Sequence, residues 1–209
     1  MITDRARLGA EWERRLVDRI AVAARAGVHL IQIRERDLDA RTLTALTGRA
    51  VDAVAGTPAR VLVNDRIDIA LAAGAHGVHL RADSVAASRA RAMLPASFLI
   101  GRSVHSLSEA LAAQEDGGLD YLLFGTVFAT SSKPGAAPAG IDALRRVAGA
   151  ATLPVLAIGG VTAANAPQVA TAGAAGLAAI GLFAHGSRDD LVIAADQAGR
   201  AFDTLSGVP

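Results

Sequence analysis

The sequence of 209 residues predicts an α/β fold, a single-domain (β/α)8 TIM barrel that spans residues 1–209. Seven short runs are apolar throughout, which is typical of parallel strands buried on both faces. Longer amphipathic stretches rich in Ala, Arg and Leu separate these runs, so that strands and helices alternate. Glycine recurs where a helix ends and a strand begins, as in Ala26-Gly27-Val28 and Ala73-Gly74-Ala75, which indicates a repeated βα unit.

The expected strands cover residues 28–34, 60–64, 77–80, 98–101, 121–125, 154–158 and 176–180. The expected helices cover about residues 11–24, 40–55, 66–73, 84–94, 106–116, 140–150, 162–172 and 188–205. Counting residues 1–4 as a short first strand gives eight units, which favours a closed barrel. An open doubly wound sheet is the alternative, but no G-x-G-x-x-G follows the first strand.

The composition excludes several classes of function. Hydrophobic residues make up 52% of the chain and aromatic residues only 3%, so the core must be aliphatic. A net charge of +1 gives no reason to expect a nucleic acid or an anionic membrane as partner. The absence of cysteine excludes disulfides, thiolate zinc sites and a cysteine nucleophile. With neither an apolar signal region nor a membrane-length apolar run, we expect a cytoplasmic protein.

Lys133 is the only lysine in the chain, and it lies in the small, hydroxyl-rich stretch Ala129-Thr130-Ser131-Ser132-Lys133-Pro134-Gly135. Functional residues of a barrel lie just past the carboxyl ends of its strands, and this stretch follows the expected strand 121–125. Backbone N–H groups, hydroxyls and one ammonium group suit a phosphate. A surface lysine without function is the alternative interpretation.

Asp65 and Asp83 follow two consecutive expected strands, whose carboxyl ends are adjacent in a barrel. Magnesium is commonly held by one or two carboxylates together with substrate phosphates and water. The pair therefore predicts a Mg2+ site. The alternative for each aspartate is a role as helix N-cap.

Three polar side chains alternate along the end of the expected strand 28–34 and so share one face: Gln32, Arg34 and Arg36. Guanidinium groups there suit bidentate phosphate binding, whereas salt bridges with Glu35 and Asp37 are the alternative.

His105, two residues after Ser103, follows the expected strand 98–101 and is a candidate general acid or base. A structural histidine at the start of a helix is the alternative. Gly159-Gly160 and Gly181 follow the last two expected strands, where this fold often binds phosphate through backbone N–H groups. Close helix–strand packing would also explain these glycines.

Together these residues resemble the superfamily of thiamine phosphate synthase and the TenI-like thiazole tautomerase, over nearly the whole chain from Ile2 to about Phe183. The segments that carry the resemblance are Gln32-Ile33-Arg34-Glu35, Val63-Asn64-Asp65-Arg66, Gly77-Val78-His79-Leu80, Ile100-Gly101-Arg102-Ser103-Val104-His105-Ser106, Thr130-Ser131-Ser132-Lys133 and Ala157-Ile158-Gly159-Gly160.

The resemblance implies a synthase that joins hydroxymethylpyrimidine pyrophosphate to thiazole phosphate and releases pyrophosphate. It implies that the pyrimidine and its pyrophosphate contact Gln32, Arg34, Asn64, Ser103, Thr130, Ser132 and Lys133. It further implies magnesium at Asp65 and Asp83, and the thiazole phosphate at Gly160, Ile180 and Gly181. Small phosphate-bearing substrates would be the partners, and a homodimer is possible because relatives form one.

The chain departs from the synthase pattern at Arg36, Arg81-Ala82, Thr126, Ser132 and Gly181. The tautomerase, in which a histidine matching His105 would move the proton without a metal, is therefore a second possibility. The synthase is favoured because the tautomerase branch usually lacks the aspartate pair. An arginine at position 81 could pair with Asp83 and displace the metal. A barrel that binds phosphate ligands without catalysis is the third possibility.

Overall fold

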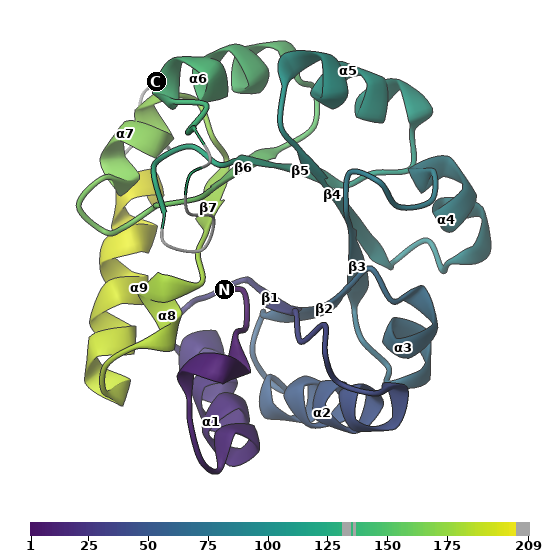
Figure 1. The fold of residues 1–209 in the computed structure, drawn as a ribbon, viewed down its shortest axis with the longest axis vertical. Coiled ribbons are helices and arrows are strands. Elements are labelled where there is room, and N and C mark those ends of the chain that lie inside the picture. Colours follow the sequence, from purple (N-terminus) through teal and green to yellow (C-terminus); the bar gives the residue numbers. More distant parts are fainter. Residues whose placement is uncertain (131–134, 136, 204–209) are drawn as a thin grey trace. The chain divides into compact units, whose positions relative to one another are not determined.

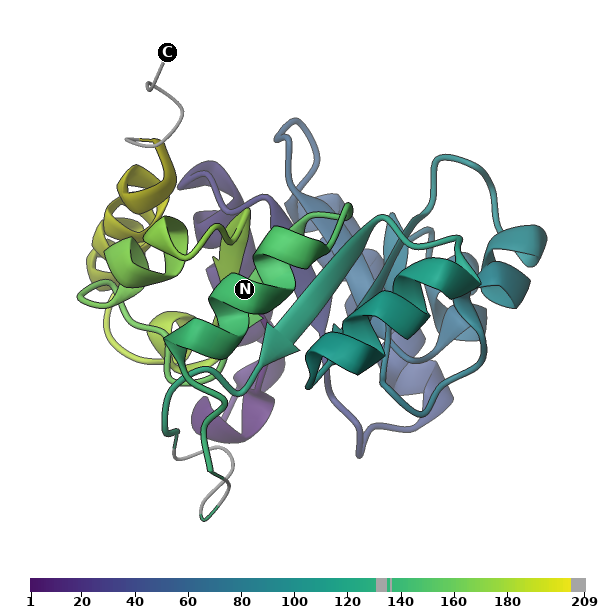
Figure 2. The ribbon, with the colours of Figure 1, turned by 90° about the horizontal axis from the view of Figure 1, so that it is seen from above.

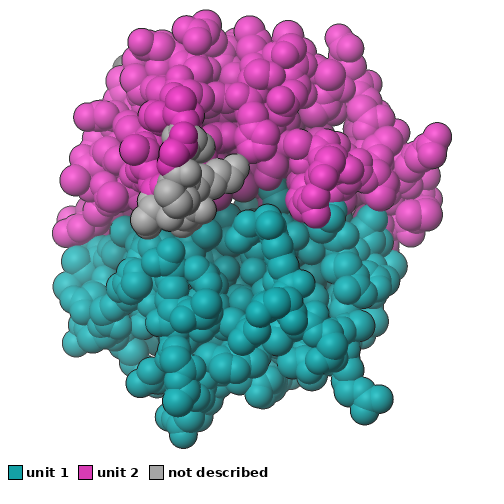
Figure 3. Space-filling view, in the orientation of Figure 1, with its two compact units in different colours: residues 1–79, 97–99, 180–196 teal, residues 80–96, 100–179, 197–209 magenta. Residues whose placement is uncertain are grey.

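The computed structural model describes residues 1–130, 135 and 137–203 (Figure 1). The chain divides into two compact units, which Figure 3 shows in two colours. The first comprises residues 1–79, 97–99 and 180–196, and the second comprises residues 80–96, 100–179 and 197–209.

The first unit contains three parallel strands in chain order, β1 (Leu30–Ile33), β2 (Arg60–Asn64) and β3 (Gly77–Leu80), the last residue of which is assigned to the second unit. Every residue of β3 is buried, as are the central residues of β2. This burial explains why the strands are continuously apolar in sequence.

The amino terminus extends this sheet only briefly. Ile2 forms an isolated parallel bridge with Gln32, and the amino group of Met1 donates to the carbonyl of Leu30 at 2.8 Å. A 3-10 helix, η1 (Arg5–Arg7), then turns the chain away. The expected pairing of residues 1–4 is therefore present, but the expectation of eight full strands is wrong: the described residues form seven.

The helices of this unit are α1 (Trp12–Arg25), α2 (Ala40–Ala53) and α3 (Ile67–Ala72), followed late in the chain by α8 (Gly181–Ala184) and by α9 (Arg188–Asp203), which continues into the second unit from residue 197. Figure 1 shows α1 and α2 side by side. Leu16, Ile20 and Leu46 are fully buried on their inner faces. The sequence pattern missed η1 and α8, because three or four residues are too few to show a helical period.

The second unit repeats the pattern with four parallel strands: β4 (Leu99–Val104), which begins one residue before this unit, β5 (Tyr121–Gly125), β6 (Val155–Ile158) and β7 (Gly176–Ala178). Its helices are α4 (Ala87–Met93), α5 (Leu107–Asp116), α6 (Ile141–Ala150) and α7 (Ala166–Thr171). Figure 2 shows α5 and α6 side by side. A Cβ at Gly101 would meet the Tyr121 ring at 2.0 Å, so only glycine fits there.

The strands keep their chain order from β1 to β7, and neighbouring strands within each unit pair in parallel. The predicted α/β class with the strand order of a TIM barrel is thus confirmed, with seven strands in place of eight. Within each unit, the carboxyl ends of the strands meet at one edge, where the fold gathers polar side chains. No helix within residues 1–130 or 137–203 is both long and apolar enough to cross a membrane.

Candidate active site

Gln32 and Asn64 meet at the carboxyl edge of the first unit. The Gln32 amide Nε2 donates to Asn64 Oδ1 at 3.0 Å, and Gln32 is 7% exposed. Asn64 lies beside His79 in the register of β2 and β3. The structure therefore brings together two of the predicted substrate-binding residues, and each amide orients the other.

Asp65 follows β2 in a left-handed backbone conformation, with φ of 61°. Its N–H donates to the carbonyl of His79 at 2.9 Å. Such a conformation costs a residue other than glycine on the order of 1 kcal/mol, although aspartate tolerates it better than most. Helix α3 begins two residues later and has Arg66 as its N-cap. The N-cap alternative for Asp65 is therefore wrong.

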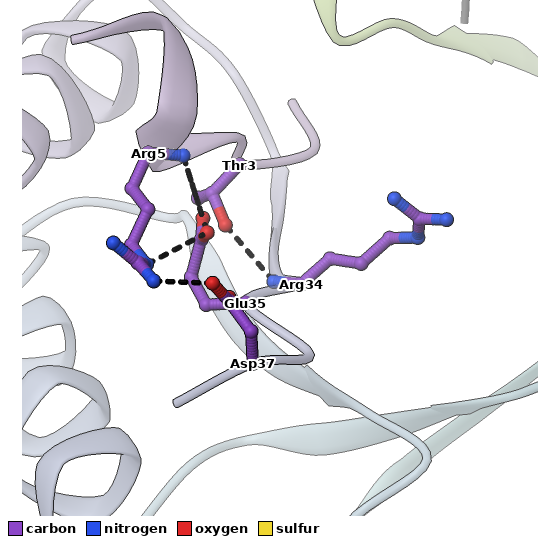
Figure 4. A network of polar contacts seen from close by, with 5 residues as sticks. All are labelled: Thr3, Arg5, Arg34, Glu35 and Asp37. Carbon is purple, nitrogen blue, oxygen red and sulfur yellow. Dashed lines mark hydrogen bonds and ion pairs between the residues drawn. The ribbon is translucent and has the colours of Figure 1, made fainter. Parts of the chain in front are cut away.

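Glu35 anchors the end of β1 to the amino-terminal segment (Figure 4). The backbone N–H of Arg5 donates to both Glu35 carboxylate oxygens, at 3.2 and 3.1 Å, and the Arg34 N–H donates to Thr3 Oγ1 at 2.9 Å. The Arg5 guanidinium pairs with Asp37 and lies 4.9 Å from the Trp12 ring centroid. No sequence pattern predicts this network, because its partners are about thirty residues apart.

Arg34 extends away from these acids, as Figure 4 shows. Glu35 and Asp37 pair with Arg5, so the salt-bridge alternative for Arg34 is wrong. No carboxylate in the described part of the chain lies within ion-pair distance of the Arg34 guanidinium. Burial lowers the pKa of Arg34 and the nearby charge of Arg36 lowers it further, whereas Asp4 and Glu35 partly oppose this at longer range. A half-buried guanidinium without an ion-paired carboxylate is a strong candidate for binding an anionic ligand. Arg36 itself is exposed.

We expect Glu35→Gln to change how stability depends on pH. Burial raises the pKa of Glu35 above its ordinary value of 4.5, and hydrogen bonds from Thr3 and Arg5 only partly oppose this. A raised pKa means that the folded state favours the protonated carboxyl. The stability that this protonation contributes is fully present below pH 4.5 and is lost as pH rises through the raised pKa. Urea unfolding from pH 4.5 to neutrality should show wild type losing stability relative to Glu35→Gln. The control is Asp37→Asn, which removes an exposed carboxylate that also pairs with Arg5. If both variants showed the same dependence of stability on pH, the prediction would be contradicted.

In the second unit, Asp83 lies on an exposed turn after β3 and pairs through Oδ2 with Arg81. Helix α4 begins later and has Ala86 as its N-cap, so the N-cap alternative for Asp83 is also wrong. Arg102 holds the same turn by donating to the carbonyls of Ala82, at 3.2 Å, and Val85. The expected competition from Arg81 is thus present. A single carboxylate has two oxygens, so Asp83 can nevertheless accept a hydrogen bond from an arginine and coordinate a metal ion at the same time.

His105 lies just past β4, close to Ser103, which is half-buried within the strand. Its Nδ1 contacts the Gly125 carbonyl oxygen, and its backbone N–H donates to Glu109 at 2.8 Å. A carbonyl only accepts, so Nδ1 must carry the proton and Nε2 is the basic nitrogen of the neutral ring. The exposed imidazole is therefore oriented for proton transfer at Nε2.

Gly159 and Gly160 pack against the segment that follows β5. Their φ values are 100° and 62°, and a Cβ at either would meet Thr126 or Ala129 at 2.4 Å. Phe128 N–H donates to the Gly159 carbonyl at 2.9 Å. Close packing therefore accounts for both glycines without excluding a phosphate contact. Thr130 is half-buried at the end of the segment they support. Ser132 and Lys133 lie outside the described residues.

Ile180 and Gly181 are in the first unit, at the start of the short helix α8. A Cβ on Gly181 would meet nothing within 4 Å, so the glycine is not required by packing. A serine at this position would therefore fit without rearrangement.

The carboxylates predicted to bind magnesium fit that metal by chemistry, because Mg2+ prefers oxygen ligands. Asp65 belongs to the first unit and Asp83 to the second. Among the described residues, no group of three or more His, Asp or Glu side chains could hold a metal ion. Any magnesium would therefore need further oxygen ligands from substrate and water.

Comparisons with known proteins agree with the resemblance seen in the sequence. A thiamine-phosphate synthase of Roseiflexus castenholzii is 42% identical over 184 residues, which are 86% of this chain and 78% of that protein. One from Methanocella arvoryzae is 41% identical over 178 residues, 85% of this chain and 82% of that protein. The structure of thiamine phosphate pyrophosphorylase from Pyrococcus furiosus matches with a TM-score of 0.83 at 30% identity, covering 99% of this chain and 95% of that chain.

A structure of 3-hexulose-6-phosphate synthase matches with a TM-score of 0.70 at 18% identity, which supports the fold alone. A family model described as thiamine monophosphate synthase matches residues 1–183. The match covers most of the chain, and full-length relatives exceed 40% identity. This chain belongs to the thiamine monophosphate synthase family.

Proposed function

We propose that the protein is a thiamine phosphate synthase that joins hydroxymethylpyrimidine pyrophosphate to thiazole phosphate. The thiazole nitrogen forms a bond to the methylene carbon of the pyrimidine, and the bond from that carbon to pyrophosphate oxygen breaks. The observation that carries the proposal is the half-buried Arg34 without an acidic partner, beside a Gln32–Asn64 amide pair, in a chain of this family.

The residues of the first unit suit the pyrimidine pyrophosphate. The Gln32 and Asn64 amides, fixed by their mutual hydrogen bond, can bind a heterocycle through the remaining amide donors and acceptors. Arg34 binds the pyrophosphate and stabilises the charge that develops as it leaves. Ile180 and Gly181 offer backbone N–H groups to the thiazole phosphate.

The residues of the second unit complete the proposed set. Ser103, Thr130 and Ser132 supply hydroxyl donors, Lys133 supplies an ammonium group to the pyrophosphate, and Gly160 binds the thiazole phosphate. Asp65 and Asp83 would hold Mg2+, which when bound neutralises charge on the leaving pyrophosphate. The thiazole nitrogen is already a nucleophile, so no side chain has to be activated.

Turnover of the purified protein tests this proposal. Hydroxymethylpyrimidine pyrophosphate and thiazole phosphate, supplied with and without magnesium, should give thiamine phosphate only when magnesium is present. A folded protein that forms no product would contradict the synthase.

The tautomerase is kept as a second candidate because the Nδ1 contact of His105 leaves Nε2 as the basic nitrogen. We expect His105→Ala to lower synthase kcat/KM by less than about tenfold, since bond formation needs no base there. A tautomerase would lose about 10²- to 10⁴-fold from the same change. Parallel assays of coupling and of thiazole carboxylate isomerisation, with Glu109→Gln as a control for local structure, separate the two functions.

We expect Lys133→Ala to lower synthase kcat/KM about 100-fold, because one charged donor to the leaving pyrophosphate is lost. Lys133→Arg retains the charge and should recover part of the rate. Steady-state kinetics with varied pyrimidine pyrophosphate measure both variants. Unchanged kinetics in Lys133→Ala would remove this residue from the site.

We further propose that the protein acts in the cytoplasm as a homodimer built from single-domain barrels. Light scattering of the purified chain at micromolar concentration tests the dimer, and a mass of 21.2 kDa would contradict it.

A further inference from the structure

A cavity of about 390 Å3 lies in the first unit, outside the set of residues proposed for the synthase. Its charged lining consists of Arg7, Arg15, Asp18, Arg19, His185 and Arg188. These residues come from η1, from α1 and from the segment between α8 and the first turn of α9. A concave surface of this size accommodates a small organic or inorganic ion.

The lining is strongly positive. Four arginines and one aspartate line the cavity, which gives the lining a net charge of +3 with the histidine counted as neutral. Asp4 and Asp190 lie outside the lining and interact with Arg7 and Arg19. The Nε2 of His185 lies 3.0 Å from Nη1 of Arg7, which can only donate, so this nitrogen is the acceptor of the contact.

Two of the arginines are held by neutral groups. Arg19 donates to the carbonyls of Phe183, His185 and Gly186 at 2.9, 2.6 and 3.0 Å. Arg15 donates to the carbonyl of Leu8 at 2.8 Å. Neither lies within ion-pair distance of a described carboxylate, although Asp190 interacts with Arg19 and Glu11 with Arg15 at longer range. Backbone contacts therefore fix the positions of both guanidinium groups.

The other two arginines retain donors as well. Arg7 bonds Asp4 through Nε at 2.7 Å, and Arg188 bonds Asp18 through Nη2 at 2.7 Å. Each guanidinium has five N–H donors in a rigid fork, so one or two bonds leave several directed outward. Positive charge and spare forked donors are what a phosphate group requires.

We propose that this cavity is a second anion site that binds a small phospho-anion, namely pyrophosphate or a phosphate monoester. Its concave shape and its single cluster of charge fit a compact anion better than a polymer, which requires an extended basic surface. Bound anion would bridge α1 to the segment after α8 and hold that segment in place. The proposal does not depend on the synthase activity.

Calorimetric titration of the full chain with inorganic pyrophosphate tests the site. Arg15→Gln and Arg188→Gln should each weaken binding about tenfold, because each removes charge-assisted bonds. Arg25→Gln, an exposed change at the end of the same helix α1, should leave the affinity unchanged. Equal affinity in wild type and both cavity variants would overturn the proposal.

Asp18→Asn is included because misfolding of a variant could weaken binding but could not tighten it. It removes the only carboxylate of the lining and should tighten binding, whereas weaker binding would contradict the proposed charge arrangement. Arg34→Gln separates this site from the synthase residues and should leave the cavity titration intact. Loss of all pyrophosphate binding in Arg34→Gln would overturn the cavity site while leaving the proposed function standing. A parallel titration with glycerol 2-phosphate distinguishes a phosphate ester from free pyrophosphate as the preferred ligand.

Discussion

Asp83→Asn should lower magnesium-dependent turnover by about 1,000-fold while leaving the fold intact. The change removes a carboxylate charge proposed to hold the metal that neutralises the leaving pyrophosphate. Asp83 lies on an exposed turn whose shape is set by Arg102 contacts to backbone carbonyls, so the fold does not depend on it. A magnesium titration of the coupling rate measures the effect, and thermal unfolding verifies the fold.

Arg81→Gln is the matched variant, because Arg81 pairs with the same carboxylate. If the guanidinium competes with the metal, this variant should reach half-maximal activity at a lower magnesium concentration than wild type. A wild-type magnesium titration from Asp83→Asn would exclude Asp83 as a ligand and assign it to the Arg81 pair alone.

Arg34→Gln should lower kcat/KM by about 100- to 1,000-fold without lowering the melting temperature. Loss of one charged donor aimed at developing charge costs this much in comparable sites. The fold should not suffer, because burial disfavours the charged form of Arg34, and no carboxylate in the described residues lies within ion-pair distance of its guanidinium. Steady-state kinetics and calorimetric unfolding measure the two effects.

Arg36→Gln is the control for general electrostatics, since Arg36 is exposed and two residues away on the same segment. We expect a change of less than about tenfold in kcat/KM from this variant. A large loss of stability in Arg34→Gln would contradict the prediction and make Arg34 a structural residue.

Sequence pattern and structure agree closely on the strands. The expected runs at 60–64, 77–80 and 121–125 match β2, β3 and β5 residue for residue. Strands that are buried on both faces are continuously apolar and therefore easy to recognise, and glycines precede β1, β3, β5 and β7. Helix ends were less accurate: the expected helix 162–172 is α7 at 166–171 only, because Asn165 and Thr162 form a hydrogen-bonded turn before it.

The roles of individual residues were decided at longer range. The sequence could not distinguish an N-cap from a ligand at Asp65, because that choice depends on where α3 starts and on a backbone φ of 61°. It could not tell whether Glu35 pairs with Arg34 or with Arg5, thirty positions away. Contacts between distant segments are set by packing, which local patterns do not encode.

The sequence by itself therefore determined the α/β class, the order of strands and helices, and the family. These follow from hydrophobic period, glycine placement and motifs, all of which are local. Only the tertiary structure decided that Arg34 lacks an acidic partner, that Arg81 engages Asp83, and that four arginines line one cavity. The physical reason is that the pairing and burial of a charged side chain depend on which segments pack together in the folded chain. The same local sequence pattern is compatible with several different packing arrangements.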